Sequence, residues 1–246
     1  MMAAFTYVQF HALFVFPALV VLVGAARMRT RSTRSDVRPI AVGVIVLVAM
    51  LYTIPWDNYL IVRGVWSYGT DSVAAVIWHA PVEEYLFILL QPVVAALWLH
   101  QISPGVPTDD ETVVTRRDRL LGIVVGGAVT IVGTVLLFEA ATFYLGAILA
   151  WSGPVLALQW AVGWPYLLAR WRTLVVGIAA PTAYLWIADR IALASGIWIL
   201  SDRYTTGLSL LGLPIEEALF FLVTNAFVVQ GLLLYPWVID RWQSRA

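Results

Sequence analysis

The chain has 246 residues, of which 61% are hydrophobic and only 12% are charged, and its mean hydropathy is +0.84. Soluble domains carry charge on roughly a quarter of their residues, so this composition excludes a soluble protein and indicates an integral membrane protein. The 15 basic and 15 acidic residues cancel, and a net charge of zero gives no reason to expect a nucleic-acid partner. Because the chain has no cysteine, disulfides, iron–sulfur clusters and thiolate chemistry are excluded as well.

Seven apolar runs approach or exceed the roughly 20 residues that a helix needs to cross a lipid bilayer. In chain order they cover residues 5–26, 40–55, 81–100, 120–138, 142–168, 174–188 and 213–237. The second and sixth runs are short, and they can extend past Asp57 and Asp189. The fifth run contains the sequence Trp151-Ser152-Gly153-Pro154, which predicts a kink or break there. The predicted fold is an all-α integral membrane protein of about seven transmembrane helices, with membrane lipid around it.

Arginine positions predict the orientation, because the cytoplasmic loops of membrane proteins carry an excess of positive charge. If the N-terminus is outside, twelve arginines lie in cytoplasmic segments and three, Arg63, Arg190 and Arg203, lie outside. The twelve are Arg27, Arg29, Arg31, Arg34, Arg38, Arg116, Arg117, Arg119, Arg170, Arg172, Arg241 and Arg245. We therefore predict a multi-pass protein of the cell membrane whose C-terminus is cytoplasmic.

Two matching segments with adjacent glutamates stand out in this apolar chain. They are residues 81–88, PVEEYLFI, and residues 214–221, PIEEALFF. A lone aspartate and a Gly-x-Trp segment precede each copy, with Asp57 before Trp66 in the first half and Asp189 before Trp198 in the second. Two further pairs match at similar offsets, namely Tyr52 with Tyr184 and Pro17 with Pro154.

These matches predict two three-helix repeats, residues 1–102 and 141–246, joined by a loop and a linking helix in residues 103–140. The linking helix restores the direction of the chain, so the repeats are parallel and related by an axis along the membrane normal. Equivalent residues of the repeats then lie at the same depth. Both glutamate pairs are therefore predicted in the outer half of the membrane, where they can face one central cavity.

Each motif begins with a proline, which favours the first position of a helix and leaves the glutamates in the first turn. In the first copy, Phe87 lies on the same helical face as Glu83 or Glu84, and Gln91 lies one turn further along. The second copy repeats the pattern with Phe220 and Thr224. A carboxyl group, an aromatic ring and a neutral hydrogen-bonding group thus follow one another into the bilayer.

Two effects compete over the charge of these glutamates. A helix N-terminus stabilises the anion by roughly 0.3–1 kcal/mol, whereas burial and a neighbouring carboxylate favour the neutral acid more strongly. We expect one protonated and one ionised group, which together form an acid and a base in an apolar pocket. The alternative is that the glutamates cap their helices at the interface, but the duplication at one depth favours a functional site. Likewise, Trp66 and Trp198 are either pocket walls or members of an interfacial aromatic belt.

Several classes of enzyme lack their signatures here. There is no G-x-G-x-x-G or P-loop sequence for a nucleotide cofactor, and His11, His79 and His100 have no metal-ligand spacing. Asp57 and Asp189 each stand alone, whereas a membrane prenyltransferase needs paired aspartates to hold Mg²⁺ and a diphosphate. CAAX-type membrane proteases also carry a double glutamate, but the set of downstream arginine and histidine residues that they require is absent around PVEEYLFI. Acid–base chemistry on a lipid-soluble substrate, without a metal or other cofactor, remains.

The tandem P-x-E-E-x-L-F segments, each preceded by the aspartate and the Gly-x-Trp loop, resemble the lycopene cyclase family. This family occurs in archaea, in two-subunit actinobacterial enzymes and in fungal fusions with phytoene synthase. The likeness covers nearly the whole chain, which looks like the single-chain archaeal form. The resemblance implies a cofactor-independent intramolecular lyase of carotenoid biosynthesis, a lycopene β-cyclase that converts lycopene through γ-carotene to β-carotene without redox change.

The resemblance also implies roles for the motif residues. Glu83 and Glu216 are the leading candidates for acid and base, and Glu84 and Glu217 are their partners. Phe87 and Phe220 would stabilise a carbocation through their rings, while Asp57 and Asp189 would orient the glutamates or relay protons. The remaining predicted pocket residues are Gln91, Thr224, Trp66, Trp198, Tyr52 and Tyr184.

Two other functions remain open from the sequence. If water captured the same cation, the enzyme would be a carotenoid hydratase that makes a tertiary alcohol. A transporter or pigment-binding membrane protein could also place two repeats around a central path and use the glutamates as proton sites. Analysis of the product formed from lycopene separates the three functions.

Overall fold

The structure, a computed structural model, describes residues 5–28, 37–69, 71–103 and 112–243. Within these residues, seven helices are long and apolar enough to cross a membrane, which confirms the predicted seven-helix membrane fold. The first crossing is continuous and consists of α1 (Tyr7–Phe10), the π-helical segment η1 (His11–Val15) and α2 (Phe16–Met28). The other crossings are α3 (Pro39–Arg63), α4 (Val82–Ile102), α5 (Arg116–Leu136), α6 (Phe143–Ala169, preceded by the 3-10 turn η2, Ala140–Thr142), α7 (Trp171–Ala194) and α8 (Ile215–Gln243).

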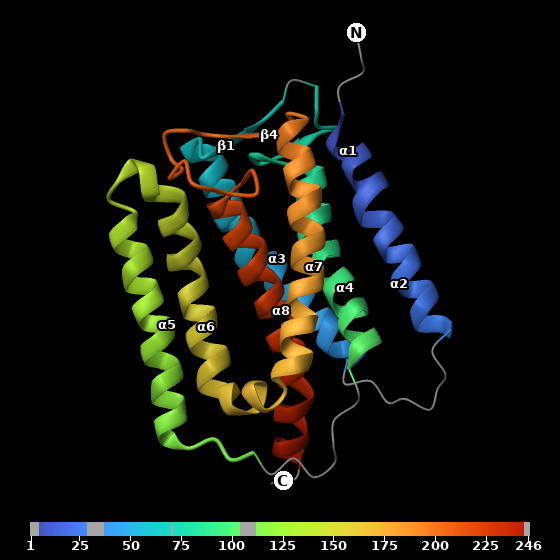
Figure 1. Cartoon of the computed structure of the whole chain (residues 1–246), viewed down its shortest axis with the longest axis vertical. Helices are drawn as coiled ribbons and strands as arrows, with labels where there is room; N and C mark the ends of the chain where they lie inside the picture. The colour runs from blue at the N-terminus through green and yellow to red at the C-terminus, as the bar shows by residue number, and fades with distance from the viewer. Residues whose placement is uncertain (1–4, 29–36, 70, 104–111, 244–246) are drawn as a thin grey trace.

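Some of the sequence predictions fall outside the part of the chain that the structure describes. Residues 104–111 of the predicted linking segment belong to this group, as do four arginines of the orientation argument. These arginines are Arg29, Arg31, Arg34 and Arg245. Among the described residues, α1 begins at one end of the bundle and α8 ends at the opposite end (Figure 1).

The short second and sixth runs do extend past their aspartates. α3 continues to Arg63 and α7 to Ala194, so Asp57 and Asp189 both lie inside their helices, two turns or less from the end. Gly64 ends α3 in the left-handed conformation, with φ of 72°, and its N–H bonds back to the last turn. Glycine adopts this conformation without the steric cost that a side chain adds, which explains why the helix stops there.

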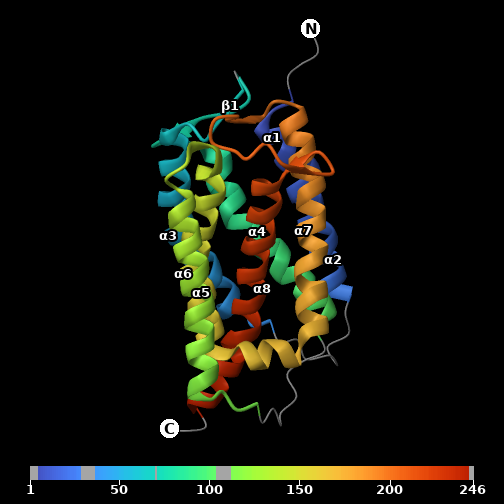
Figure 2. The ribbon, with the colours of Figure 1, turned by 60° about the vertical axis from the view of Figure 1, so that its left-hand side comes forward.

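The predicted kink of the fifth crossing lies elsewhere. α6 remains helical through Trp151 and Pro154 and departs from helical dihedral angles at Gly163, where φ is −170° and ψ is 46°. Pro165 follows two residues later and cannot donate a backbone hydrogen bond, so the helix loses support at this point. The last turns of α6 then lie across the long axis of the bundle and lead into α7 (Figure 2). α3, α4, α7 and α8 also contain prolines. A membrane helix tolerates the backbone hydrogen bond that a proline removes when neighbouring helices pack against it.

α4 and α8, the helices that begin with the glutamate motifs, form the centre of the bundle. α4 packs against α2, α3, α7 and α8, and α8 packs in addition against α3, α6 and α7. α5 packs mainly against α6 and lies at the edge of the bundle (Figure 1). Its buried Gly122, Gly126 and Gly133 allow the two backbones to approach closely, as small residues do in membrane helix pairs.

Short strands cover the end of the bundle where α4 and α8 begin. β1 (Trp66–Tyr68) pairs antiparallel with β4 (Trp198–Leu200), and this pairing joins the two halves of the chain. β2 (Val76–Ile77) pairs with β3 (Ala80–Pro81), and β5 (Ser209–Leu210) pairs with β6 (Leu213–Pro214). The sequence analysis expected loops here. The strands thus lie at the same end of the bundle as the first turns of α4 and α8, which carry the glutamates.

Matched contacts recur in the two halves. The hydroxyl of Tyr52 donates to the carbonyl oxygen of Trp151 at 2.8 Å, and that of Tyr184 donates to the carbonyl oxygen of Phe14 at 2.8 Å. Gly64 and Gly196, just after α3 and α7, both have a positive φ, and the N–H of each bonds to the carbonyl oxygen three residues back. The division into residues 1–102, 103–140 and 141–246 stays a prediction, which these contacts support.

The bundle has an apolar core at the end opposite the strands. Leu99 of α4, Tyr166 of α6 and Leu232 and Leu233 of α8 are fully buried there, beside Trp237. Close packing and dispersion between these large side chains hold α4, α6 and α8 together. The core fills the interior at this end of the bundle. The cavities between the helices therefore lie nearer the end that the strands cover.

Candidate active site

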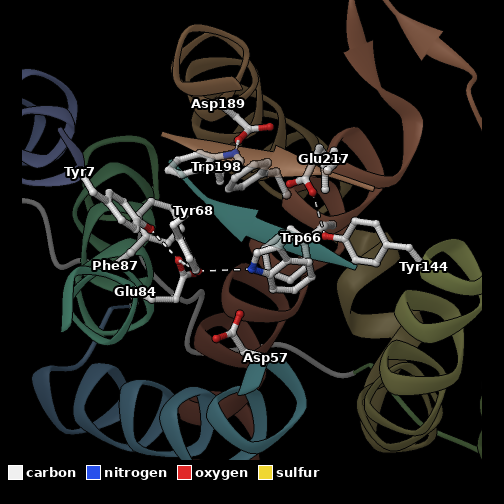
Figure 3. Close-up of a pocket in the computed structure, with 13 residues that line it drawn as sticks. Tyr7, Asp57, Trp66, Tyr68, Glu84, Phe87, Tyr144, Asp189, Trp198 and Glu217 are labelled. Carbon is white, nitrogen blue, oxygen red and sulfur yellow. Dashed lines mark hydrogen bonds between the residues drawn. The ribbon is translucent and has the colours of Figure 1, made fainter. Parts of the chain in front are cut away.

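Two adjoining cavities lie between the helices beneath the β1–β4 pair. The first, of about 490 Å³, is enclosed by residues of both halves (Figure 3). The second, of about 800 Å³, lies between α3, α4, α6 and α8. Asp57, Glu84, Phe87 and Phe220 line both cavities, so the acidic groups and the larger apolar space are continuous.

Glu84 projects into the first cavity and accepts hydrogen bonds from two phenols. The hydroxyl of Tyr7 donates to its Oε2 at 2.8 Å, and the hydroxyl of Tyr68 donates to the same oxygen at 3.2 Å. The indole N–H of Trp66 donates in turn to the hydroxyl of Tyr68 at 3.3 Å. This chain of donors comes from α1 and β1 and fixes the carboxyl group at the start of α4.

Glu217 occupies the corresponding place at the start of α8, on the opposite side of the cavity (Figure 3). Its Oε1 accepts a hydrogen bond from the hydroxyl of Tyr144 at 2.9 Å. Tyr144 begins α6 as Tyr7 begins the first crossing, and both backbone N–H groups bond to carbonyl oxygens of the strand-bearing loops. The two halves therefore present a tyrosine–glutamate pair each, with one difference: Leu200 lies on the cavity wall of the second half where Tyr68 lies in the first.

Glu83 and Glu216, the leading candidates of the sequence analysis, line neither cavity. Oε1 of Glu83 accepts the backbone N–H of Ala74 at 2.7 Å, and Oε1 of Glu216 accepts the backbone N–H of Thr206 at 2.7 Å. The two side chains are 3% and 0% exposed. They anchor the loops that precede the helices. In each pair, the second glutamate faces the cavity, and the first, which was the leading candidate, does not.

The start of each helix also differs from the expectation. The prolines were expected at the first helical position, but Pro81 ends β3 and Pro214 ends β6, and the helices begin one residue later. Successive residues of a helix point about 100° apart. Of two adjacent glutamates in a first turn, one therefore faces back to the preceding loop and the other faces the bundle axis.

The aspartates complete a set of four carboxyl groups at the cavity. Asp57 and Asp189 are 4% and 1% exposed, and both line the first cavity together with Glu84 and Glu217. The indole N–H of Trp198 donates to Oδ1 of Asp189 at 3.0 Å. No basic side chain lines the cavity in the described residues, and four uncompensated charges in so small an apolar space would repel one another. The cavity can therefore hold both protonated and ionised carboxyl groups, as the predicted acid–base chemistry requires.

Three tyrosines of this site are absent from the sequence prediction. Tyr7 and Tyr144 are separated by the same 137 residues as Pro17 and Pro154, so the repeat contained the signal for this pair. Tyr68 has no tyrosine counterpart in the second half, and only the structure reveals it. Burial, and next the charge of the Glu84 carboxylate, raise the pKa of Tyr68 well above its ordinary value. The phenol therefore remains a proton-bearing donor.

Aromatic rings form the walls between the two cavities. Phe220 stacks on Trp56, with ring centroids 5.8 Å apart and an interplanar angle of 10°, and Trp151 lies beside it. Phe87 meets Phe221 edge to face at 6.1 Å. The predicted pocket residues Phe87 and Phe220 thus lie next to the carboxyl groups, where an aromatic face can stabilise a positive charge.

The remaining predicted residues fall in two places. Tyr52, Gln91 and Thr224 line the second cavity. The amide of Gln91 donates to Oδ1 of the neighbouring Asn225 at 2.7 Å, and the hydroxyl of Thr224 donates to carbonyl oxygens of its own helix. Tyr184 lies apart, on a narrower crevice of about 290 Å³.

Comparison with known proteins assigns the chain to a family. Residues 4–101 and 140–235 match the family described as lycopene cyclase. The chain belongs to the lycopene cyclase family. It is 50% identical to the lycopene beta-cyclase of Halobacterium salinarum over 238 residues, which cover 97% of this chain and 99% of that protein. Both glutamate motifs lie inside the matched segments, whereas α5 lies between them.

Fungal relatives are more distant and longer. The bifunctional lycopene cyclase/phytoene synthase of Aspergillus niger is 33% identical over 214 residues, which cover 82% of this chain and 36% of that protein. The corresponding protein of Phycomyces blakesleeanus is 32% identical over 232 residues, or 91% of this chain and 38% of that protein. No solved structure matches the chain.

Proposed function

We propose that this membrane protein is a lycopene β-cyclase in which Glu84 and Glu217 carry the protons. The observation that supports these residues is their position: each projects from the first turn of a central helix into the cavity that also contains Phe87 and Phe220. Membership of the family and the names of its relatives support the substrate. Glu83 and Glu216 are instead assigned to anchoring the loops.

The proposed reaction is an isomerisation whose atoms balance without a cofactor. A carboxylic acid adds a proton to C2 of the terminal C1=C2 double bond of lycopene, which leaves a tertiary cation at C1. The C5=C6 double bond attacks C1, so that the C1–C6 bond forms and the positive charge moves to C5. A carboxylate then removes the proton from C6, and the new C5=C6 double bond completes the β-ring. One proton enters and one leaves for each ring.

The hydrogen bonds suggest which glutamate starts in which form. Glu84 accepts two phenolic hydrogen bonds, from Tyr7 and Tyr68, whereas Glu217 accepts one, from Tyr144. Donors stabilise the ionised form of a carboxyl group, so Glu84 is the better base and Glu217 the better acid. After the reaction Glu84 releases its proton to solvent and Glu217 is reprotonated from solvent, and Asp57 and Asp189 in the same cavity provide a path for these transfers.

Exclusion of water directs the cation towards the ring. The β1–β4 pair closes the outer end of the cavity, and Trp66, Trp198, Phe220 and Phe221 line its walls. Water at C1 would give a tertiary alcohol, as in a hydratase, and apolar walls disfavour that outcome. A transporter would move its substrate unchanged, and the names of the relatives argue against this function.

Product analysis tests the proposal. Membranes that contain the wild-type protein are expected to convert lycopene into hydrocarbons with β-rings, whereas membranes with Glu84→Gln or Glu217→Gln are expected to return lycopene almost unchanged. Glutamine keeps the size of the side chain and its acceptor oxygen but has no transferable proton. A tertiary alcohol from the wild type would establish a hydratase, and normal cyclisation by both variants would refute the assignment of the glutamates.

The orientation of the bundle is part of the same proposal. Among the described residues, the arginines predicted to be cytoplasmic lie on the segments at the end of the bundle opposite the strands, where α8 finishes (Figure 1). Because the chain has no cysteine, single introduced cysteines report the side of the membrane. Leu208→Cys near the strands should react with an impermeant maleimide in intact cells, and Val113→Cys before α5 should react only after permeabilisation. The opposite pattern would invert the orientation.

A further inference from the structure

The 800 Å³ cavity is built to hold a long apolar molecule behind the acidic groups. Asp57 and Glu84 lie where this cavity adjoins the first one, and they are its only charged lining residues among those described. From there it descends between α3, α4, α6 and α8 to Ile45 and Val228, which border the apolar core.

The cavity reaches the lipid-facing surface between α3 and α6. Val48 and Tyr52 line it and are nevertheless 55% and 39% exposed, so these two residues border an opening on the side of the bundle. Tyr52 also stacks on Trp151 of α6, with centroids 5.5 Å apart, and donates its hydroxyl to the carbonyl oxygen of that residue. This aromatic contact bridges α3 and α6 above the opening. Below it, Val155 of α6 faces the cavity.

The equivalent space in the other half of the bundle is largely filled. The crevice between α2 and α7 measures about 290 Å³ and is lined by Phe14, Ala18, Tyr184 and their neighbours. The contact of Tyr184 with Phe14 corresponds to that of Tyr52 with Trp151. The crevice therefore occupies the position that a twofold arrangement assigns to a second channel.

Particular substitutions between the halves account for the difference. Leu185 of the crevice lies 132 residues after Thr53 of the larger cavity, and Pro181 lies 132 residues after Ala49. Both crevice residues are larger and fill space that the first half leaves open. Because the interior of a helix bundle is closely packed, these larger side chains have little room to move aside. The crevice is therefore narrower than the cavity of the first half.

We propose that the larger cavity is a single polyene channel that serves both ends of the substrate in turn. One end group lies at the glutamates while the conjugated chain extends along the channel to the lipid. The polyene is too long and rigid to turn inside a cavity of about 800 Å³, so after the first ring forms the monocyclic product leaves, reverses and re-enters. This inference rests on the proposed cyclase function.

Matched substitutions in the two halves test the single channel. Val155→Trp fills the channel, and Ala18→Trp fills the crevice at the position 137 residues earlier. Val155→Trp is expected to lower the rate for both lycopene and monocyclic γ-carotene by roughly tenfold or more, the effect of one large group in a binding site. Ala18→Trp is expected to leave both rates within about twofold of the wild type. Selective loss of the second ring in Ala18→Trp would show that the crevice serves the other end and would overturn the proposal.

A reciprocal exchange covers the case in which tryptophan prevents folding. Thr53→Leu places in the channel the residue that the crevice carries, and Leu185→Thr does the reverse. The first variant should slow both cyclisation steps and the second should slow neither. If Thr53→Leu cyclises both substrates at the wild-type rate, the channel assignment is wrong.

An isotope experiment tests the release of the monocyclic product. Wild-type membranes convert labelled lycopene in the presence of excess unlabelled γ-carotene, and the label in the bicyclic product is measured. Release predicts that this label falls in proportion to the excess. Undiluted label, or a wild type that stops at one ring, would overturn the inference while leaving cyclisation intact. If no cyclic product forms from either substrate, the proposed function fails instead.

Discussion

Exchanging the adjacent glutamates Glu216 and Glu217 separately for glutamine is expected to give opposite defects. Glu217 faces the cavity and carries a transferable proton, so Glu217→Gln should lower the rate of ring formation by about 100-fold to 10,000-fold, the usual contribution of a general acid. The amide oxygen of the new glutamine can still accept the hydroxyl of Tyr144, which is now 2.9 Å from Oε1. The loss of stability should therefore stay near 1 kcal/mol.

Glu216→Gln should instead weaken the fold. Oε1 of Glu216 accepts the backbone N–H of Thr206 at 2.7 Å, and Oε2 is buried without a hydrogen-bond partner among the described residues. Glutamine loses the bond to Thr206 if its NH₂ group faces that N–H, and otherwise it buries the NH₂ group where no acceptor is available. Either outcome corresponds to about 1–3 kcal/mol, or a melting temperature lower by several degrees. The rate per folded molecule should remain within a few-fold of the wild type because the cavity is unchanged.

Two measurements on each variant separate the roles. The initial rate of conversion of lycopene, normalised to the amount of folded protein, reports the chemistry, and thermal unfolding in detergent reports stability. The reasoning would be refuted if Glu216→Gln lost its rate at unchanged stability. It would equally be refuted if Glu217→Gln cyclised lycopene as fast as the wild type.

Other substitutions give distinct results. Burial, and next the charge of Glu84, raise the pKa of Tyr68. The neutral phenol therefore stabilises the fold below about pH 10, and this contribution is lost as the pH rises further. Tyr68→Phe should show a smaller fall in melting temperature at alkaline pH than the wild type. Phe220→Leu removes an aromatic face worth roughly 2 kcal/mol to a desolvated cation, so cyclisation should slow about 30-fold at unchanged substrate binding. Gly126→Val would overlap the backbone of Ala157 in α6, so it should lower thermal stability while the product pattern remains that of the wild type.

The fold was largely predictable because lipid imposes a simple rule. Seven apolar runs predicted seven helices, and these are present. Their exact ends depended on local chemistry that hydrophobicity does not report. Gly64 stops α3 well beyond the last apolar residues of the predicted run, and Gly163 breaks α6 where the packing of α8 and the following Pro165 permit it, not at Pro154.

The candidate site was predictable to the level of the motif but not of the atom. The duplicated glutamate pairs predicted the two turns of helix that carry Glu84 and Glu217, but adjacent helical residues point about 100° apart, and the sequence does not show which member of a pair faces the cavity. Tyr68 escaped prediction because it belongs to a strand pair that joins distant segments, and such long-range pairing leaves no periodic signal in the sequence.

Cyclisation of lycopene in D₂O tests the central claim, proton transfer from an exchangeable carboxyl group to the polyene. Carboxyl protons exchange with solvent between turnovers, so each ring is expected to acquire one deuterium at C2 and to lose the hydrogen originally bound at C6. Mass spectrometry of the bicyclic product should therefore show two added deuterium atoms, and that of the monocyclic product one. A cyclic product without deuterium, or with deuterium elsewhere in the ring, would contradict the account.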